Sequence, residues 1–193
     1  MTISLPTVVV IGGGDLRLNA TFGIDRYVVS LAGRASPKAV FFGPSKMETF
    51  FSRVYADMLG CRLLGQDQLD SAEIIYIGGM PEPEALTDIL RAGKRGAVLC
   101  GLGEAAGIFF PTVIRAVFCP HYDENQDFDR QMIGRRLPAL GIDNHCAMVF
   151  LGDSFRIVQS RPDARAFKIE DYNGFVVRKI IDNQDYRAVG ELF

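Results

Sequence analysis

The fold prediction starts from the stretch AVLCGLGEAAGIFF, residues Ala97–Phe110. The stretch opens with an uninterrupted apolar run, Ala97–Cys100, which is typical of a strand buried on both faces of a parallel sheet. The run passes into residues with little or no side chain: Gly101, Gly103, Ala105, Ala106 and Gly107. Small residues let a strand end in a sharp turn and let a helix start close against the sheet. The stretch therefore predicts a strand, a tight turn and a helix.

A strand, turn and helix of this kind form the nucleophile elbow of hydrolases, which holds one reactive side chain at the carboxyl edge of the sheet. Neither Ser, Cys nor Thr occupies the tip of the turn here, where Gly103 or Glu104 stands instead. The sequence thus predicts the frame of a hydrolase site without its usual nucleophile.

The composition indicates one globular domain, residues 1–193, with 48% hydrophobic and 23% charged residues. The 21 basic and 23 acidic residues are mixed along the chain and leave a net charge of −2, which argues against a nucleic-acid or membrane partner. The first apolar run, Val8–Ile11, is far too short to span a bilayer, so we expect a cytoplasmic protein. We expect no cofactor, and a homodimer is left open.

The four cysteines stand singly in the sequence, with no CxxC spacing between any two of them. Such spacing predicts neither a zinc site nor a redox pair. We expect Cys61, Cys100, Cys119 and Cys146 to be reduced thiols that serve as small apolar residues, and we expect no metal site.

Before the elbow, strand and helix patterns alternate along the chain. Apolar runs predict strands over Leu5–Ile11, Lys38–Phe42, Cys61–Leu64 and Ile74–Ile77. Helical spacing predicts helices over Phe22–Arg34, from Ser45 to Gly60 and from Pro81 to Gly93. Ser45 and Glu48 form the pattern of a capping box at the start of the second helix. This alternation predicts a parallel sheet with helices on both faces.

After the elbow the pattern changes. We expect a strand over Val113–Phe118 and a polar helix over Gln126–Leu137 with Phe128, Met132 and Ile133 facing inward. Short strands are predicted over Cys146–Leu151, Phe155–Gln159, Ala164–Ile169 and Phe175–Lys179, with a hairpin turn at Asn173-Gly174. The whole pattern predicts an α/β fold, a three-layer αβα sandwich whose mainly parallel sheet carries antiparallel C-terminal strands.

Four segments carry a family resemblance that extends over nearly the whole chain in the right order. They are Ala72–Gly79, which is similar to AD-x-IY-x-GGGNT; Phe118–Asp123, which contains PHYD; Gly141–Asn144 with the strand and Arg161-Pro162 turn after it; and Ser45–Cys61. These segments resemble the peptidase E (aspartyl dipeptidase) family of the class I glutamine-amidotransferase-like superfamily. The resemblance implies that superfamily's αβα sandwich. It also implies a serine hydrolase that releases N-terminal Asp from small peptides.

The resemblance implies roles for single residues and also shows where this chain departs from the family. His121 corresponds to the general base, and Gly78, Gly79 and Gly103 correspond to the elbow and oxyanion region. The family's elbow reads GxSAGA, but one register puts Gly103 at the serine and the other puts Glu104 there. The family's GGGNT is altered after its first two glycines, and we can place no third triad member.

Three of the candidate site residues therefore have two interpretations each, and His145 has one. Glu104 is either a nucleophile or base acting on water, or an acid that caps the following helix. His121 is either a working general base or a hydrogen-bonding residue with nothing to activate. Asp143 either binds a substrate amine or lies exposed in a turn. His145 is expected in a loop that lines the same cleft.

Two main hypotheses for function follow. The first is a peptidase-E-like hydrolase of small peptides or amides that is inactive or weakly active because its nucleophile is lost. The second is a non-catalytic homologue that binds a small ligand or takes part in an assembly. A nucleotide-binding protein is a third hypothesis, which rests only on the turn Gly12–Gly14.

Overall fold

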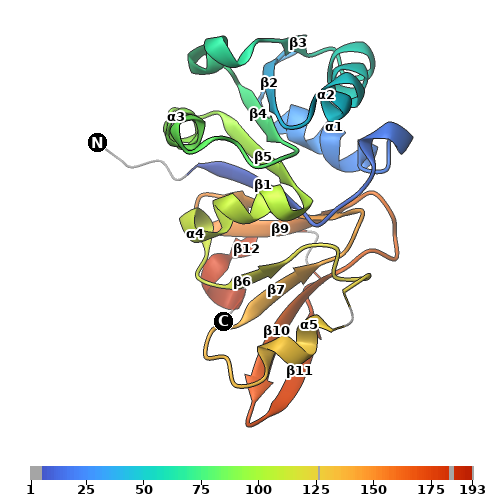
Figure 1. Ribbon diagram of the computed structural model, residues 1–193, viewed down its shortest axis with the longest axis vertical. Coiled ribbons are helices and arrows are strands. Elements are labelled where there is room, and N and C mark those ends of the chain that lie inside the picture. The colour runs from blue at the N-terminus through green and yellow to red at the C-terminus, as the bar shows by residue number, and fades with distance from the viewer. Residues whose placement is uncertain (1–5, 126, 183–184, 193) are drawn as a thin grey trace.

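The computed structural model describes residues 6–125, 127–182 and 185–192 (Figure 1). An eight-stranded sheet forms its centre. In spatial order the strands are β12 (Arg187–Ala188), β9 (Ser154–Gln159), β8 (Cys146–Leu151), β1 (Thr7–Ile11), β5 (Val98–Leu102), β4 (Ile74–Ile77), β2 (Lys38–Phe42) and β3 (Arg62–Leu63). Strands β1 to β5 are mutually parallel, whereas β8, β9 and β12 join in antiparallel fashion. The expected mainly parallel sheet with antiparallel C-terminal strands is confirmed.

Helices cover both faces of this sheet and make three layers (Figure 1). One face is covered by α1 (Phe22–Leu31), α2 (Ser45–Ser52) and its π-helical continuation η2 (Arg53–Met58). The other is covered by α3 (Pro83–Lys94), the 3-10 helix η4 (Gly103–Phe109) and α4 (Phe110–Val113). In β1, Val9 and Ile11 face the first layer, while Val8 and Val10 face the second. Its apolar sequence therefore follows from burial on both sides.

Short 3-10 helices complete the main unit: η1 (Leu16–Leu18), η3 (Gln66–Ser71) and η5 (Val189–Leu192). Several elements agree with the sequence prediction, because β2, β4 and β8 coincide with the expected apolar runs. Asn173 and Gly174 have φ angles of 55° and 87°, as the predicted hairpin turn requires. All four cysteines are unpaired and buried, as expected.

A second, four-stranded sheet was not predicted. Its order is β11 (Phe175–Ile180), β10 (Ala166–Tyr172), β7 (Ala139–Ile142) and β6 (Val117–Cys119), and it lies at the lower end in Figure 1. The prediction that the last strands all extend the main sheet is therefore wrong for β10 and β11. The missing partner is β7, a buried four-residue strand that pairs with both β6 and β10. A run this short has too little periodicity to be recognised in the sequence.

Three local predictions are also wrong. Pro44 is the N-cap of α2 and Ser45 is already its first helical residue. No side-chain hydrogen bond is made at this cap, so the capping box does not form. The strand expected over Val113–Phe118 is shorter and starts later. Val113 is the last residue of α4, and β6 contains only the three residues Val117–Cys119. The polar helix is shortened to α5 (Phe128–Met132), and Ile133 beyond it is 54% exposed rather than buried. Gln126, its predicted start, lies outside the described residues. Phe128 and Met132 do face the core.

No helix among residues 6–125, 127–182 and 185–192 has the length and apolar character needed to cross a membrane.

Candidate functional site

The candidate site lies at the carboxyl edge of the main sheet, between β1 and β5. These strands are parallel neighbours, but β1 leads to α1 on one face and β5 leads to η4 on the other. In open α/β sheets, ligands bind in the crevice that forms where neighbouring connections leave to opposite faces. The topology therefore points to the turns that follow Ile11 and Leu102.

Gly103 occupies the tip of the elbow. It directly follows β5, is buried, and has a φ angle of +58°, which only glycine adopts without cost. Glu104 comes one residue later, in the first turn of η4, and its side chain is 81% exposed. The two registers left open by the sequence are thus resolved in favour of Gly103. A β-carbon on Gly101 would lie 2.5 Å from the Ala106 Cα, which explains the small residues around the turn.

His121 lies directly over this tip. A β-carbon placed on Gly103 would lie 2.9 Å from His121 Nε2. The position follows from backbone pairing, because the His121 amide, two residues beyond β6, donates to the Gly12 carbonyl at 2.9 Å. The end of β1 therefore holds the histidine above the end of β5. The imidazole stands where a general base for an elbow nucleophile would stand.

Asn144 orients the His121 ring. Its Nδ2 faces Glu124 Oε1 at 2.9 Å and Asp123 Oδ1 at 3.2 Å. Carboxylates only accept hydrogen bonds, so this side of Asn144 must be the donating amide and Oδ1 must face His121. His121 Nδ1 then donates to Asn144 Oδ1 at 2.7 Å. In the neutral ring this leaves the lone pair on Nε2, the nitrogen nearest Gly103.

The glycine turn after β1 makes room for this pair. A β-carbon on Gly13 would lie 2.2 Å from Asn144 Oδ1 and 2.3 Å from His121 Nδ1. Both distances are far shorter than any non-bonded contact. Glycine at position 13 is thus explained by the histidine and asparagine above it. This explanation removes the need for a nucleotide phosphate at Gly12–Gly14.

Glu104 approaches the same ring from the exposed side. Its Oε2 lies 3.6 Å from His121 Nε2, so the two groups attract when the imidazole is protonated. Together they open onto a cavity of about 380 Å³, lined also by Phe118, Cys119, Pro120, Glu124, Asn125 and Phe128. We call this cavity the His121 groove. It contains a base and a carboxylate, and a glycine stands where the nucleophile would be.

The amide of Gly78, which the resemblance assigns to the oxyanion region, is already engaged in a backbone hydrogen bond. It donates to the Phe42 carbonyl at 2.7 Å and thus belongs to the sheet. A β-carbon on Gly79 would lie 2.9 Å from Pro44 Cδ. The two glycines let the turn after β4 pass close to the turn after β2, which is a packing role.

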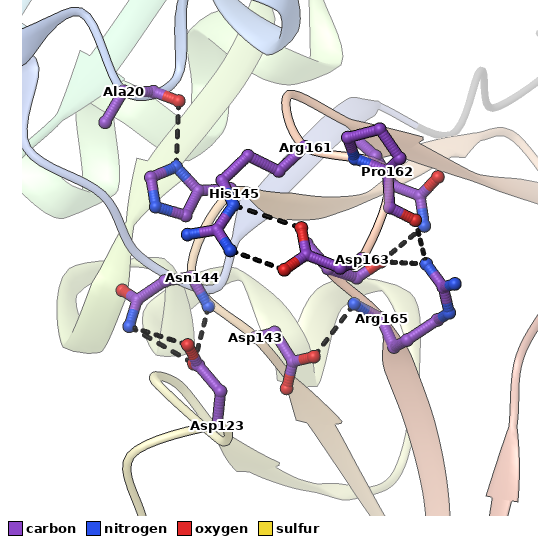
Figure 2. A network of polar contacts seen from close by, with 11 residues as sticks. Ala20, Asp123, Asp143, Asn144, His145, Arg161, Pro162, Asp163 and Arg165 are labelled. Atoms are coloured by element: carbon purple, nitrogen blue, oxygen red, sulfur yellow. Dashed lines mark hydrogen bonds and ion pairs between the residues drawn. The ribbon is translucent and has the colours of Figure 1, made fainter.

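For Asp143 the structure excludes one of the two interpretations, and for His145 it differs from the expected position. Asp143 is only 7% exposed, so it does not lie in an exposed turn. His145 is not among the residues that line the His121 groove, and its Nδ1 lies 3.0 Å from the Ala20 carbonyl (Figure 2). It lines a separate small cavity that it shares with Asp143. Backbone pairing causes this, because the His145 amide donates to the Gly13 carbonyl at 2.9 Å.

Asn144 is the functional candidate that the sequence did not reveal. It belongs to the quoted segment Gly141–Asn144, but an asparagine after a strand is common in turns and carried no distinctive signal. Only the closure of the loop after β7 against the residues after β6 brings it to His121. Within the part of the chain that the structure describes, no three His, Cys, Asp or Glu side chains are grouped to hold a metal ion.

No protein-family model matches this chain, and no curated protein matches it.

The orientation of His121 can be tested directly. Asn144→Ala removes the acceptor for Nδ1–H, so we expect the neutral ring to shift from the Nδ1–H tautomer toward the Nε2–H tautomer. Two-bond ¹H–¹⁵N correlation spectra of the imidazole distinguish the two forms. Asn125→Ala is the matched control, since Asn125 lines the same groove but its amide contacts Cys119 Sγ instead. A wild-type ring that is Nε2–H in neutral solution would contradict the assignment.

Proposed function

We propose that this protein is a non-catalytic, peptidase-E-like protein that binds a small peptide or amide in the His121 groove. The observation that carries this proposal is the 2.9 Å separation between His121 Nε2 and the β-carbon position of Gly103. The base and the residue that orients it are in place, while the elbow tip has no side chain.

The absence of a nucleophile matters more than the presence of the base. Covalent catalysis needs a nucleophilic side chain that attacks the substrate, and at an elbow the base activates that side chain. The Gly78 amide, which the resemblance placed in the oxyanion region, is bonded within the sheet. The remaining groups can bind a polar ligand through the His121 imidazole and the exposed Glu104 carboxylate. We also infer a cytoplasmic location, which the four buried, unpaired thiols support.

The proposal predicts binding without turnover. We expect wild-type protein to leave Asp-Leu and Asp-p-nitroanilide uncleaved and to remain unlabelled by a fluorophosphonate probe. Uncleaved Asp-Leu should shift the amide resonances of Gly103 and His121 in a ¹H–¹⁵N titration. The variant His121→Ala should weaken these shifts. Fluorophosphonate labelling or cleavage of Asp-Leu by the wild type would refute a non-catalytic role, and absence of binding across a dipeptide panel would refute the groove as a ligand site.

Water activation by Glu104 is the second candidate function. It is favoured by the 3.6 Å approach of Glu104 Oε2 to His121 Nε2, because a water beside this pair has two neighbouring groups able to accept its protons. Under this alternative, slow cleavage of Asp-p-nitroanilide should be lost in Glu104→Gln and in His121→Ala alike. Fluorophosphonate would still leave the wild type unlabelled, so the two assays separate this candidate from a serine-type hydrolase.

A further inference from the structure

Asp143 has one carboxylate oxygen that receives no hydrogen bond from any of the described residues. It immediately follows β7 and is only 7% exposed. Its Oδ2 accepts a hydrogen bond from the Arg165 amide at 2.8 Å, whereas Oδ1 is buried without a partner (Figure 2). A buried carboxylate oxygen without a donor is costly, so this atom needs a hydrogen-bond donor from outside the described residues, either a water or a group of a ligand.

Two hollows adjoin at this residue. The larger, of about 500 Å³, is lined by Asp143, Asp123, Tyr122, Asn125, Asp129, Phe167 and Arg178. The smaller, of about 80 Å³, shares Asp123 and Asp143 and adds Asn144, His145, Arg161, Asp163 and Ala164. We call the larger hollow the Asp143 hollow. It shares Asn125 with the His121 groove, so the two spaces are neighbours along one surface.

The charge in the Asp143 hollow is unbalanced. Asp129 is neutralised by Arg178, whose Nε lies 3.1 Å from Oδ2. Asp123, by contrast, accepts only from Asn144, with the backbone amide at 2.8 Å. Among the described residues, neither Asp123 nor Asp143 has an ion-pair partner within 4 Å. Burial raises the pKa of the Asp143 carboxyl above its ordinary value. The hydrogen bond from the Arg165 amide and the Arg165 charge lower it, but they do not cancel the effects of burial and of the neighbouring Asp123 charge.

We propose that the Asp143 hollow binds a cationic group, an alkylammonium or a guanidinium, that belongs to the ligand of the His121 groove. This inference rests on the proposed function and names its substrate class: small peptides or amides with a basic side chain. An ammonium supplies N–H donors to the Asp143 oxygen that has no partner, and it supplies positive charge to two carboxylates without a direct ion pair among the described residues. The described residues offer no group of three ligands for a metal ion, so an organic cation fits the chemistry better.

Hydrogen bonds connect the Asp143 hollow to the His121 imidazole. Asp123 accepts from both the backbone and the side-chain amide of Asn144, at 2.8 and 3.2 Å. Asn144 in turn holds the His121 ring at 2.7 Å. A ligand that spans both spaces therefore contacts one hydrogen-bonded network. Its cation lies on the carboxylate side and its amide lies on the imidazole side.

Two peptides that differ only in charge test the proposal. Alanyl-lysinamide and alanyl-norleucinamide have side chains of similar length, but only the first carries a side-chain ammonium. We expect wild-type protein to bind the lysine peptide about tenfold more tightly, because a charge-assisted hydrogen bond adds that much or more. The measurement is a ¹H–¹⁵N titration, in which the lysine peptide should shift the amides of Asp123, Asp143 and Asn144.

Asp143→Asn should abolish the preference and bring the lysine peptide to the affinity of the norleucine peptide. An asparagine keeps an oxygen for the Arg165 amide, and thermal melts will verify that the variant folds. Asp88→Asn is the matched control, because it removes the same charge from the exposed surface of α3, where Asp88 pairs with Arg91 at 2.7 Å. It should leave the preference unchanged.

The outcomes separate this inference from the proposed function. Equal affinity for the two peptides, with shifts at Gly103 and His121, would overturn the cationic subsite and leave the binding groove standing. A preference for the lysine peptide that survives Asp143→Asn would also overturn it. Binding of neither peptide would overturn the inference, and together with failure of the dipeptide panel it would overturn the proposed function.

Discussion

Gly103→Ser should convert a protein that fluorophosphonate leaves unlabelled into one that it labels covalently. The new β-carbon would lie 2.9 Å from His121 Nε2, and the ring can retreat by a fraction of an ångström to admit the hydroxyl. The Nε2 lone pair is already directed to this side by the Nδ1 hydrogen bond to Asn144. The variant would thus acquire a serine beside an oriented general base. Labelling followed by intact mass spectrometry measures the effect.

Two further variants show whether the label depends on this geometry. Gly103→Ala puts the same β-carbon at the tip without a hydroxyl and should stay unlabelled. Adding His121→Ala to Gly103→Ser should slow labelling by about 100-fold or more, since general base catalysis contributes about 10² to 10⁴ in rate. Both single variants should lose about 1–2 kcal/mol of stability, because an L-residue is strained at a φ of +58°. Equal labelling of the serine variant with and without His121 would contradict the arrangement.

Asp25→Asn should remove a large pH dependence of stability that lies outside the candidate site. Asp25 is fully buried in α1, and this burial raises the pKa of its carboxyl to about 7. Thr21 Oγ1 donates to Oδ2 at 2.8 Å, and the Tyr55 hydroxyl donates to Oδ1 at 3.0 Å. Asparagine is nearly isosteric, and the Thr21 hydroxyl can rotate to accept from its amide.

The sign follows from proton binding. Between pH 4 and pH 7 the folded state keeps the Asp25 proton while the unfolded state releases it, so stability falls as the pH rises. The stabilisation is fully present below the unfolded pKa of 3.8 and is lost as the pH rises to about 7. A difference of about three pKa units corresponds to about 4 kcal/mol. The free energy of unfolding of the wild type, relative to Asp25→Asn, should therefore drop by about 4 kcal/mol from pH 4 to pH 8.

Urea denaturation of both proteins across this pH range measures the difference, in which the titration of all other groups cancels. The exposed variant Asp88→Asn should follow the wild-type profile within about 0.5 kcal/mol. A difference between wild type and Asp25→Asn that does not change with pH would show that Asp25 is ionised in the folded protein at low pH. The location of Asp25 explains why Asp25→Asn should respond and the exposed variant Asp88→Asn should not, since the Asp25 carboxyl lies close to the buried side chains of Tyr55, Tyr76 and Cys100.

The main sheet and the elbow at its edge could be predicted from the amino-acid sequence alone. A strand that is buried on both faces is apolar along its whole length, as in Ile74–Ile77. Such a strand can therefore be recognised from its own sequence, without knowing which strands lie beside it in the sheet. The small residues from Gly101 to Gly107 predicted the sharp turn for a similarly local reason, because backbone packs directly against them. The lack of a hydroxyl or thiol at the elbow tip is likewise a property of the residues alone.

Which residues come together at the elbow depends on long-range contacts that only the three-dimensional structure shows. The choice of Gly103 over Glu104 depends on a backbone angle, and the position of His121 depends on a hydrogen bond to Gly12, more than 100 residues away in the chain. The pairing of Asn144 with His121, the burial of Asp143 and the second sheet all depend on where β7 lies. No local periodicity encodes such long-range closures, because they are selected by the packing of the whole chain.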